Sequence, residues 1–161
     1  MKNLLVVCLI LSLSALSSAQ TPKPEMFMTA EEIKFGDPRA SSFFRWSTSA
    51  GGYLLRHDGV GEFTSPQHLR RIFYVTIGSK RRLERVYYLE HERDLFLLYE
   101  IRGHGFYLVR MEQTDRTKRK IRWSVALGDL SGEDPSLDGE VIMIGKVIAV
   151  SKADGRVLKR D

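Results

Sequence analysis

The sequence predicts an all-β protein, and three observations support this fold class. From residue 42 onward, short runs rich in Val, Ile, Tyr and Phe recur about every ten residues. Gly, Asp, Pro and Ser divide these runs, and the Asp-Gly pairs among them suit tight turns because both residues tolerate positive φ. Downstream of Ile33, no segment has a helical period over about ten residues. We therefore expect an antiparallel meander of about ten short strands, built as partial propeller-like blades or, alternatively, as a closed β-barrel or sandwich.

The first 19 residues are typical of a cleavable signal peptide. Lys2 supplies the positive n-region, Leu4–Leu13 is the apolar core, and Ser17 and Ala19 are the small residues that signal peptidase requires. The apolar run is too short for a permanent membrane-spanning helix. We expect cleavage near Ala19–Gln20, and hence a secreted or periplasmic protein without a transmembrane anchor.

Cleavage would also limit the chemistry of the mature chain. Cys8 is the only cysteine and Asn3 the only asparagine of the sequence, and both lie within the signal peptide. The mature chain then has no thiol for a disulfide, a metal or a substrate, and no acceptor for N-glycosylation. Its stability must come from an apolar core, for which residues 29–161 are long enough as a single all-β domain.

Two elements are expected before the first long strand. Residues 20–28 are short, polar and proline-containing, which predicts a loose N-terminal arm. Thr29 with Glu32 three positions later forms a capping-box pattern, which predicts one short helix over Thr29–Ile33.

The strands expected after this helix follow the β-rich runs in chain order. The best hairpin joins the last two runs, because Asp154-Gly155 lies between them. The predicted strands are Ser42–Trp46, Tyr53–Arg56, Ile72–Ile77, Leu83–Glu90, Leu95–Ile101, Phe106–Glu112, Ile121–Leu127, Val141–Ile144, Val147–Ser151 and Arg156–Lys159.

An internal repeat links the last third of the chain to the segment before it. Gly105 begins a strand, a charged turn and a second strand that ends at Trp123, and Gly145 begins the same pattern 40 residues later. In this pattern, and in the Asp154-Gly155 turn, residues 83–161 resemble the repeats of pyrroloquinoline-quinone-type β-propellers. The resemblance implies four-stranded blades that dock through tryptophan.

The sequence departs from that family in two respects. Lys159 stands where the repeat carries a second tryptophan, which weakens docking at that end. A 40-residue period gives the chain about three blades, whereas closed propellers have at least four. No residue that would hold the quinone can be placed here, so we predict no cofactor.

Candidate catalytic and metal sites are weak. Glu90, His91, Glu92 and Asp94 are close in sequence, but strand alternation sends neighbours to opposite faces, so a solvated hairpin tip is the better interpretation. A carboxylate pair for glycoside hydrolysis could come only from the Gly128–Gly139 loop, which carries Asp129, Glu133, Asp134 and Asp138. We predict no catalytic and no metal-binding residue, and a hydrolase remains the least favoured alternative.

The candidate binding surface consists of aromatic residues and one histidine. Tyr87 and Tyr88 are adjacent in a strand, so one ring fills the core and the other lies on the opposite face, where aromatic rings favour recognition. His104 lies between two glycines in a predicted turn, and Trp123 ends the first repeat. These four residues, Tyr87, Tyr88, His104 and Trp123, form the predicted binding surface.

The formal net charge of +5 comes from basic clusters at 80–85 and 116–122. In an exported protein such clusters indicate solvated turns rather than a nucleic-acid site, and we expect no nucleic-acid partner. The leading hypothesis is a non-enzymatic module that binds a protein or an extracellular glycan. The alternative is a small-ligand carrier built around a β-barrel cavity.

Overall fold

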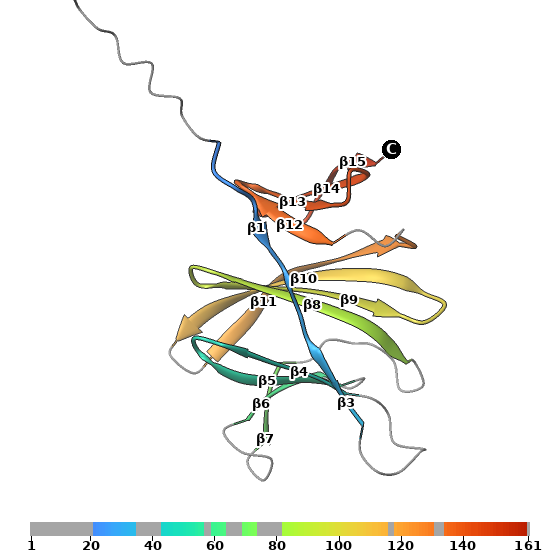
Figure 1. Cartoon of the computed structure of the whole chain (residues 1–161). Coiled ribbons are helices and arrows are strands. Elements are labelled where there is room, and N and C mark those ends of the chain that lie inside the picture. Colours follow the sequence, from blue (N-terminus) through green and yellow to red (C-terminus); the bar gives the residue numbers. More distant parts are fainter. Residues whose placement is uncertain are drawn as a thin grey trace, which may run out of the picture.

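A computed structural model describes residues 21–34, 43–56, 59–63, 69–73, 82–115, 118–130 and 134–160 of the chain. Every regular element in these ranges is a β-strand, and all strand pairs are antiparallel. The strands form three five-stranded sheets that stack on one another (Figure 1). The predicted all-β meander is confirmed.

Each sheet contains one four-stranded meander of consecutive strands. We call the three sheets the first, middle and last sheets, in the order of their meanders along the chain. The first meander is β4 (Phe43–Thr48), β5 (Gly51–Arg56), β6 (Gly59–Phe63) and β7 (Leu69–Phe73); the second is β8 (Leu83–His91), β9 (Asp94–Ile101), β10 (Gly105–Asp115) and β11 (Lys118–Gly128); the third is β12 (Pro135–Asp138), β13 (Val141–Ile144), β14 (Ile148–Ser151) and β15 (Val157–Arg160).

The fifth strand of each sheet comes from residues 25–33. This segment is called the arm below, and it extends beyond the arm predicted over residues 20–28. Its strands β1 (Glu25–Met26), β2 (Met28–Thr29) and β3 (Glu31–Ile33) pair with β12, β8 and β4 respectively. The arm thus crosses the last, middle and first sheets in turn, as the blue strand in Figure 1 shows. Residues 25–28, for which the sequence predicts a loose arm, are therefore largely paired.

The predicted helix over Thr29–Ile33 is wrong, because Thr29 ends β2 and Glu31–Ile33 form β3. A capping box contributes only about 1 kcal/mol, and a five-residue helix is far below the length that is stable in isolation. Between these two strands, Ala30 is 4% exposed in the core, and its N–H donates a hydrogen bond to the carbonyl of Val86. Long-range pairing and burial therefore outweigh the local helical signal.

Two apolar cores separate the three sheets. Side chains of the first and middle sheets, such as Leu55, Leu97 and Val109, fill one core. Side chains of the middle and last sheets, such as Leu98 and Ile142, fill the other. The middle sheet is thus covered on both faces, which explains why β9 reads as a continuous apolar run rather than an alternating one.

None of the three sheets closes on itself. The strand orders run from β3 to β7, from β2 to β11 and from β1 to β15, with open ends in each case. The described strands therefore do not form the closed barrel that was the alternative fold, nor the barrel cavity on which the carrier alternative depends.

In the ranges that the structure describes, no helix is long and apolar enough to cross a membrane. The predicted signal peptide, residues 1–19, lies outside the described residues.

Candidate binding clefts at the sheet boundaries

The four residues of the predicted binding surface lie at different places. Tyr87 packs against the core between the middle and last sheets, whereas Tyr88 packs against the core between the middle and first sheets. His104 is exposed in the turn between β9 and β10, and Trp123 is half-buried in β11, against the last sheet. The structure therefore does not bring them together into one surface, although Tyr88 and Trp123 each line a cleft.

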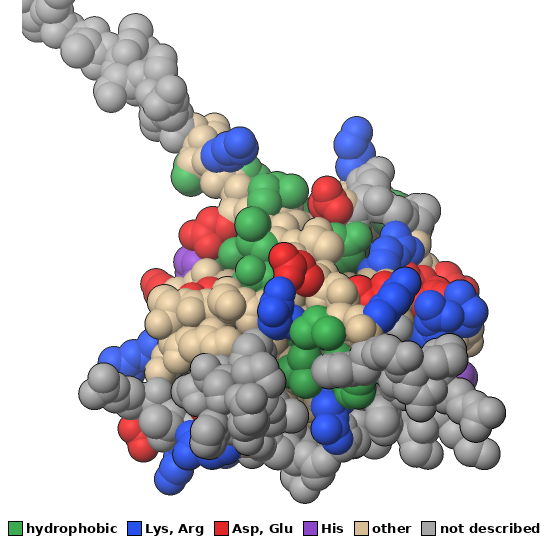
Figure 2. Space-filling model, turned by 60° about the horizontal axis from the view of Figure 1, so that its bottom comes forward, with side chains coloured by type: hydrophobic (Ala, Val, Ile, Leu, Met, Phe, Trp, Pro, Cys, Tyr) green, Lys and Arg blue, Asp and Glu red, His purple; other side chains and the backbone are tan. Residues whose placement is uncertain are grey.

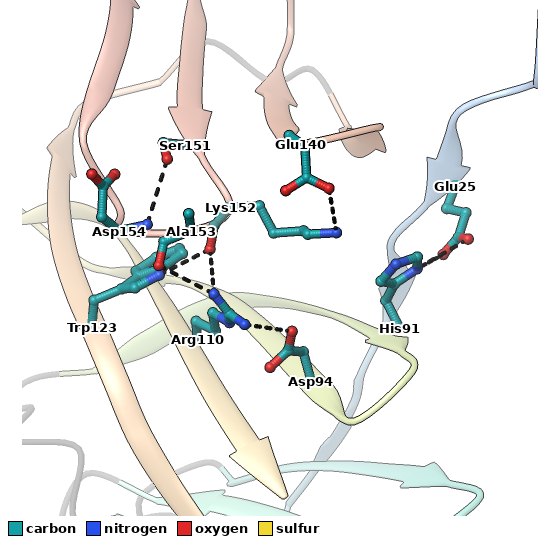
Figure 3. Close-up of polar contacts among 10 residues, drawn as sticks. All are labelled: Glu25, His91, Asp94, Arg110, Trp123, Glu140, Ser151, Lys152, Ala153 and Asp154. Atoms are coloured by element: carbon teal, nitrogen blue, oxygen red, sulfur yellow. Dashed lines mark hydrogen bonds and ion pairs between the residues drawn. The ribbon is translucent and has the colours of Figure 1, made fainter.

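Trp123 docks onto the turn between β14 and β15 (Figure 3). Its indole Nε1 donates a hydrogen bond to the Lys152 carbonyl at 3.1 Å, and its ring lies against Gly155. The ring of Trp123 also packs against Phe96 in a tilted arrangement, with 6.2 Å between the ring centroids. Trp123 therefore holds the last sheet against the middle sheet.

Arg110 of β10 clamps the same turn. Its Nη1 donates to the carbonyls of Lys152 and Ala153 at 2.9 and 3.1 Å, and its Nη2 lies 2.9 Å from Oδ2 of Asp94. The Arg110 and Asp94 side chains are 20% and 9% exposed, so the ion pair is largely removed from water. The clamp joins strands of two sheets through one guanidinium (Figure 3).

Gly155→Ala is expected to destabilise the protein by at least about 2 kcal/mol. Gly155 has a φ of +74°, and a Cβ there would lie 2.7 Å from Cδ2 of Trp123. Left-handed backbone costs about 1–2 kcal/mol for a residue with a Cβ, and overpacking adds about 1–3 kcal/mol. Gly139→Ala is the matched control, since its φ is +59° but its Cβ would meet nothing within 4 Å. Urea denaturation should show a clearly larger loss for Gly155→Ala; equal losses would contradict the docking of Trp123.

The first cleft, called the Trp123 cleft, has a volume of about 470 Å³ at the boundary of the middle and last sheets. Its walls combine the indole with charged side chains; Glu112 and Arg122 form an ion pair across β10 and β11. The lining residues are Arg110, Glu112, Arg122, Trp123, Ala153 and Asp154. A hydrogen bond with the Ser151 hydroxyl, followed by interactions with Arg156, holds the pKa of the Asp154 carboxyl below its usual value.

The second cleft, called the Tyr88 cleft, has a volume of about 370 Å³ at the boundary of the first and middle sheets. The rings of Trp46 and Tyr88 are stacked beside it, with 6.0 Å between centroids and 30° between planes. An ion pair between Arg45 Nη2 and Glu31 Oε2, at 2.5 Å, joins β4 to the arm at its rim. The lining residues are Thr29, Glu31, Arg45, Trp46, Ser47 and Tyr88.

A network behind the Tyr88 cleft fixes its aromatic wall. Trp46 stacks on Tyr53 with 5.5 Å between centroids, and the Tyr53 hydroxyl accepts a hydrogen bond from Arg119 Nε at 3.0 Å. The Arg119 side chain is only 3% exposed, and its guanidinium lies 5.5 Å from the Tyr53 ring centroid. Because Trp46 is held from behind in this way, the cleft is formed before any ligand arrives.

The end of β4 leaves backbone hydrogen-bonding groups at the Tyr88 cleft. The arm covers β4 only over Phe43–Arg45, where β3 pairs with it. Thr48 pairs with Gly51 to close a two-residue hairpin, so the backbone groups of Ser47 point away from β5, toward the edge that β3 leaves uncovered. Donors and acceptors of both the backbone and the side chains are therefore available in this cleft.

The acidic side chains around His91 do not converge. Glu90 accepts hydrogen bonds from Ser49, His91 Nδ1 lies 3.0 Å from Glu25 Oε2, and Asp94 pairs with Arg110. Among the described residues, no group of three or more His, Cys, Asp or Glu side chains is placed to hold a metal ion. In the predicted Gly128–Gly139 loop, whose carboxylates were the candidates for glycoside hydrolysis, Glu133 lies outside the described residues.

Several cleft residues were missed by sequence reasoning. Trp46, Arg45 and Glu31 meet Tyr88 only through sheet stacking and the path of the arm, for which the sequence carries no local signal. Arg110 is half-buried in β10 and Arg119 is buried in β11, but both strands carry further charged residues, so no local pattern marks either arginine as covered. Two sequence signals did point to cleft residues: alternation placed Tyr87 and Tyr88 on opposite faces, and the repeat singled out Trp123.

The chain matches no protein-family model, no curated protein and no solved structure.

Proposed function

We propose that this chain is an exported, non-enzymatic glycan-binding module whose carbohydrate site is the Tyr88 cleft. The observation that carries the proposal is the stacked pair of Trp46 and Tyr88 in an open cleft rimmed by hydroxyls and an ion pair. Export rests on the signal peptide predicted over residues 1–19.

The chemistry of this cleft suits a sugar ring. A pyranose has an apolar C–H face, which packs on an aromatic ring, and equatorial hydroxyls, which need donors and acceptors in fixed positions. Tyr88 supplies the aromatic surface, since it is the half-buried member of the stack. Thr29 and Ser47 supply hydroxyls, and Arg45 with Glu31 supplies a planar donor and a planar acceptor side by side.

The surface charge also favours a neutral polar ligand. On the face shown in Figure 2, basic and acidic side chains lie next to one another rather than in a single-sign field. The predicted basic cluster at 116–122 is divided in the same way, because Arg119 is buried and Arg122 pairs with Glu112. Local pairing of this kind leaves little net attraction for a polyanion.

We further propose that the three meanders are related to propeller repeats, as the sequence resemblance implies. Each of the three meanders has four strands, and Trp123 of one meander docks on the Asp154-Gly155 turn of the next. In this proposal the three stacked sheets are the rigid frame, and the ligand sites lie at the boundaries between them.

Sedimentation with insoluble peptidoglycan, chitin and cellulose tests the proposal. The protein is expected to be retained by at least one of these polymers, and Tyr88→Ala to weaken retention about tenfold. The reason is that an aromatic contact contributes about 0.5–1.5 kcal/mol beyond the area it buries, and about 1.4 kcal/mol is a factor of ten in affinity.

Tyr87→Ala is the matched control for this experiment, since Tyr87 is the neighbouring tyrosine on the opposite face of β8. It is expected to bind the polymer as the unaltered protein does. Retention by none of the three polymers, or equal retention of Tyr88→Ala and Tyr87→Ala, would contradict the proposal.

A further inference from the structure

We infer that the Trp123 cleft is a second glycan site, so that one molecule of this protein holds two carbohydrate chains at once. This inference rests on the proposed function of the Tyr88 cleft, but it concerns a different pair of sheets and different residues.

The two clefts share their chemical components. Each combines an aromatic side chain with a guanidinium–carboxylate pair that bridges two strands: Arg45 with Glu31 in one, and Arg122 with Glu112 in the other. Each is open to solvent at a boundary between stacked sheets, with volumes of about 370 and 470 Å³. These are the groups that orient a sugar: a ring for its apolar face, and fixed donors and acceptors for its hydroxyls.

The Trp123 cleft is also preformed. The indole Nε1 is occupied by the Lys152 carbonyl and part of the ring lies against Gly155, so the exposed remainder of this half-buried ring is what a ligand would contact. Arg110 holds the same turn through the carbonyls of Lys152 and Ala153. Asp154 adds a carboxylate acceptor, which the backbone N–H and Nε of Arg156 hold in place by hydrogen bonds.

The geometry of the two clefts means that each would bind a separate carbohydrate chain. Tyr88 lies on β8 and faces the first sheet, whereas Trp123 lies on β11 and faces the last sheet. In the strand order of the middle sheet, β9 and β10 separate β8 from β11, which places them about 14 Å apart. Because the two rings face opposite sides of this sheet, one short oligosaccharide cannot contact both.

The sequence supplies a separate reporter for each cleft, because Trp46 and Trp123 are its only tryptophans. We would titrate the single-tryptophan variants Trp46→Phe and Trp123→Phe with the pentasaccharides of chitin and cellulose and with a soluble peptidoglycan fragment, and record tryptophan fluorescence. Both variants are expected to give a saturable change with the same sugar. The Trp46→Phe protein reports the Trp123 cleft, and the Trp123→Phe protein reports the Tyr88 cleft.

Removing the ion pair at the rim of the Trp123 cleft shows whether the fluorescence change at Trp123 comes from this cleft. Glu112→Ala with Arg122→Ala is expected to weaken the change at Trp123 at least tenfold and to leave that at Trp46 unaltered. Glu84→Ala with Arg102→Ala is the matched control, because it removes another partly exposed ion pair, between β8 and the turn after β9, that lines neither cleft. If Trp123→Phe does not fold, the unaltered protein and its Glu112→Ala, Arg122→Ala variant are compared by calorimetry, with two sites expected to become one.

The outcomes separate this inference from the proposed function. A response at Trp46 with none at Trp123, or one bound sugar per molecule, would overturn the second site and leave the first. A response at Trp123 that survives the Glu112→Ala, Arg122→Ala change would also overturn it. No response at either tryptophan, together with no retention on the polymers, would overturn both.

Discussion

Arg110→Met is expected to lower the free energy of unfolding by about 3–5 kcal/mol. The substitution removes the donors that bind the carbonyls of Lys152 and Ala153, and it leaves the Asp94 carboxylate without its partner. Asp94 is only 7% exposed, and its Oδ1 already lacks a hydrogen-bond partner. Urea denaturation followed by tryptophan fluorescence measures the loss.

Arg119, a buried arginine of the neighbouring strand β11, provides the control for this prediction. Arg119→Met is expected to lower the free energy of unfolding by only about 1–2 kcal/mol, because it removes one hydrogen bond, from Nε to the Tyr53 hydroxyl, together with two Nη groups that are buried without hydrogen-bond partners. Its neighbour Glu90 keeps the two hydrogen bonds from Ser49 and is 23% exposed. A loss of less than about 1 kcal/mol for Arg110→Met, or a larger loss for Arg119→Met, would show that Arg110 is not the clamp between the sheets.

Phe27→Ala is expected to cost about 3–5 kcal/mol, the usual range for truncating a buried phenylalanine. Phe27 lies between β1 and β2, is 7% exposed, and packs in the core between the middle and last sheets. Its N–H also donates to the Pro135 carbonyl at 3.3 Å. The arm strands are too short to hold by pairing alone, so this side chain is the main anchor of the arm.

Met28→Ala is the matched control, since Met28 is the next residue and is 60% exposed. It is expected to change stability by less than about 0.5 kcal/mol. Equal effects of the two substitutions in thermal or urea denaturation would mean that the arm is not anchored through Phe27.

The β-rich texture of the sequence predicted most of the longer strands. In β8, β10 and β11, runs of β-branched and aromatic residues between turn residues marked the strands to within a few positions. Of the predicted strand Ile72–Ile77, only the first two residues fall in the described part of the chain, where they end β7. The strands β6 and β12 were missed, because Gly59, Gly61 and Pro135 have low strand propensity and pair only within their sheets.

The arm could not be predicted from local sequence. Its strands β1 and β2 have two residues each, and their conformation depends on partners more than 50 residues away, such as Tyr88 and Leu137. The capping box at Thr29 pointed instead to a helix. A local pattern gave the wrong answer here because the deciding free energy is non-local.

The candidate sites divide in the same way. Paired aromatics correctly indicated that Tyr87 and Tyr88 face opposite sides, but the register of β8 was needed to show that it is Tyr88 that meets Trp46. Trp123 was found through its place in a repeat, although its ring both docks a turn and lines a cleft. The ion pairs at the rims join strands far apart in the chain and had no sequence signal.

Backbone amide mapping by NMR would show where on the protein a carbohydrate binds. The ¹H–¹⁵N spectrum of the unaltered protein would be recorded during titration with the pentasaccharide of the polymer that retains it. We expect saturable shifts at the residues of the Tyr88 cleft, with Ser47 and Tyr88 among the largest, and we expect them to be lost in Tyr88→Ala but not in Tyr87→Ala. Saturable shifts confined to regions outside the Tyr88 cleft, or no shifts at all, would contradict it.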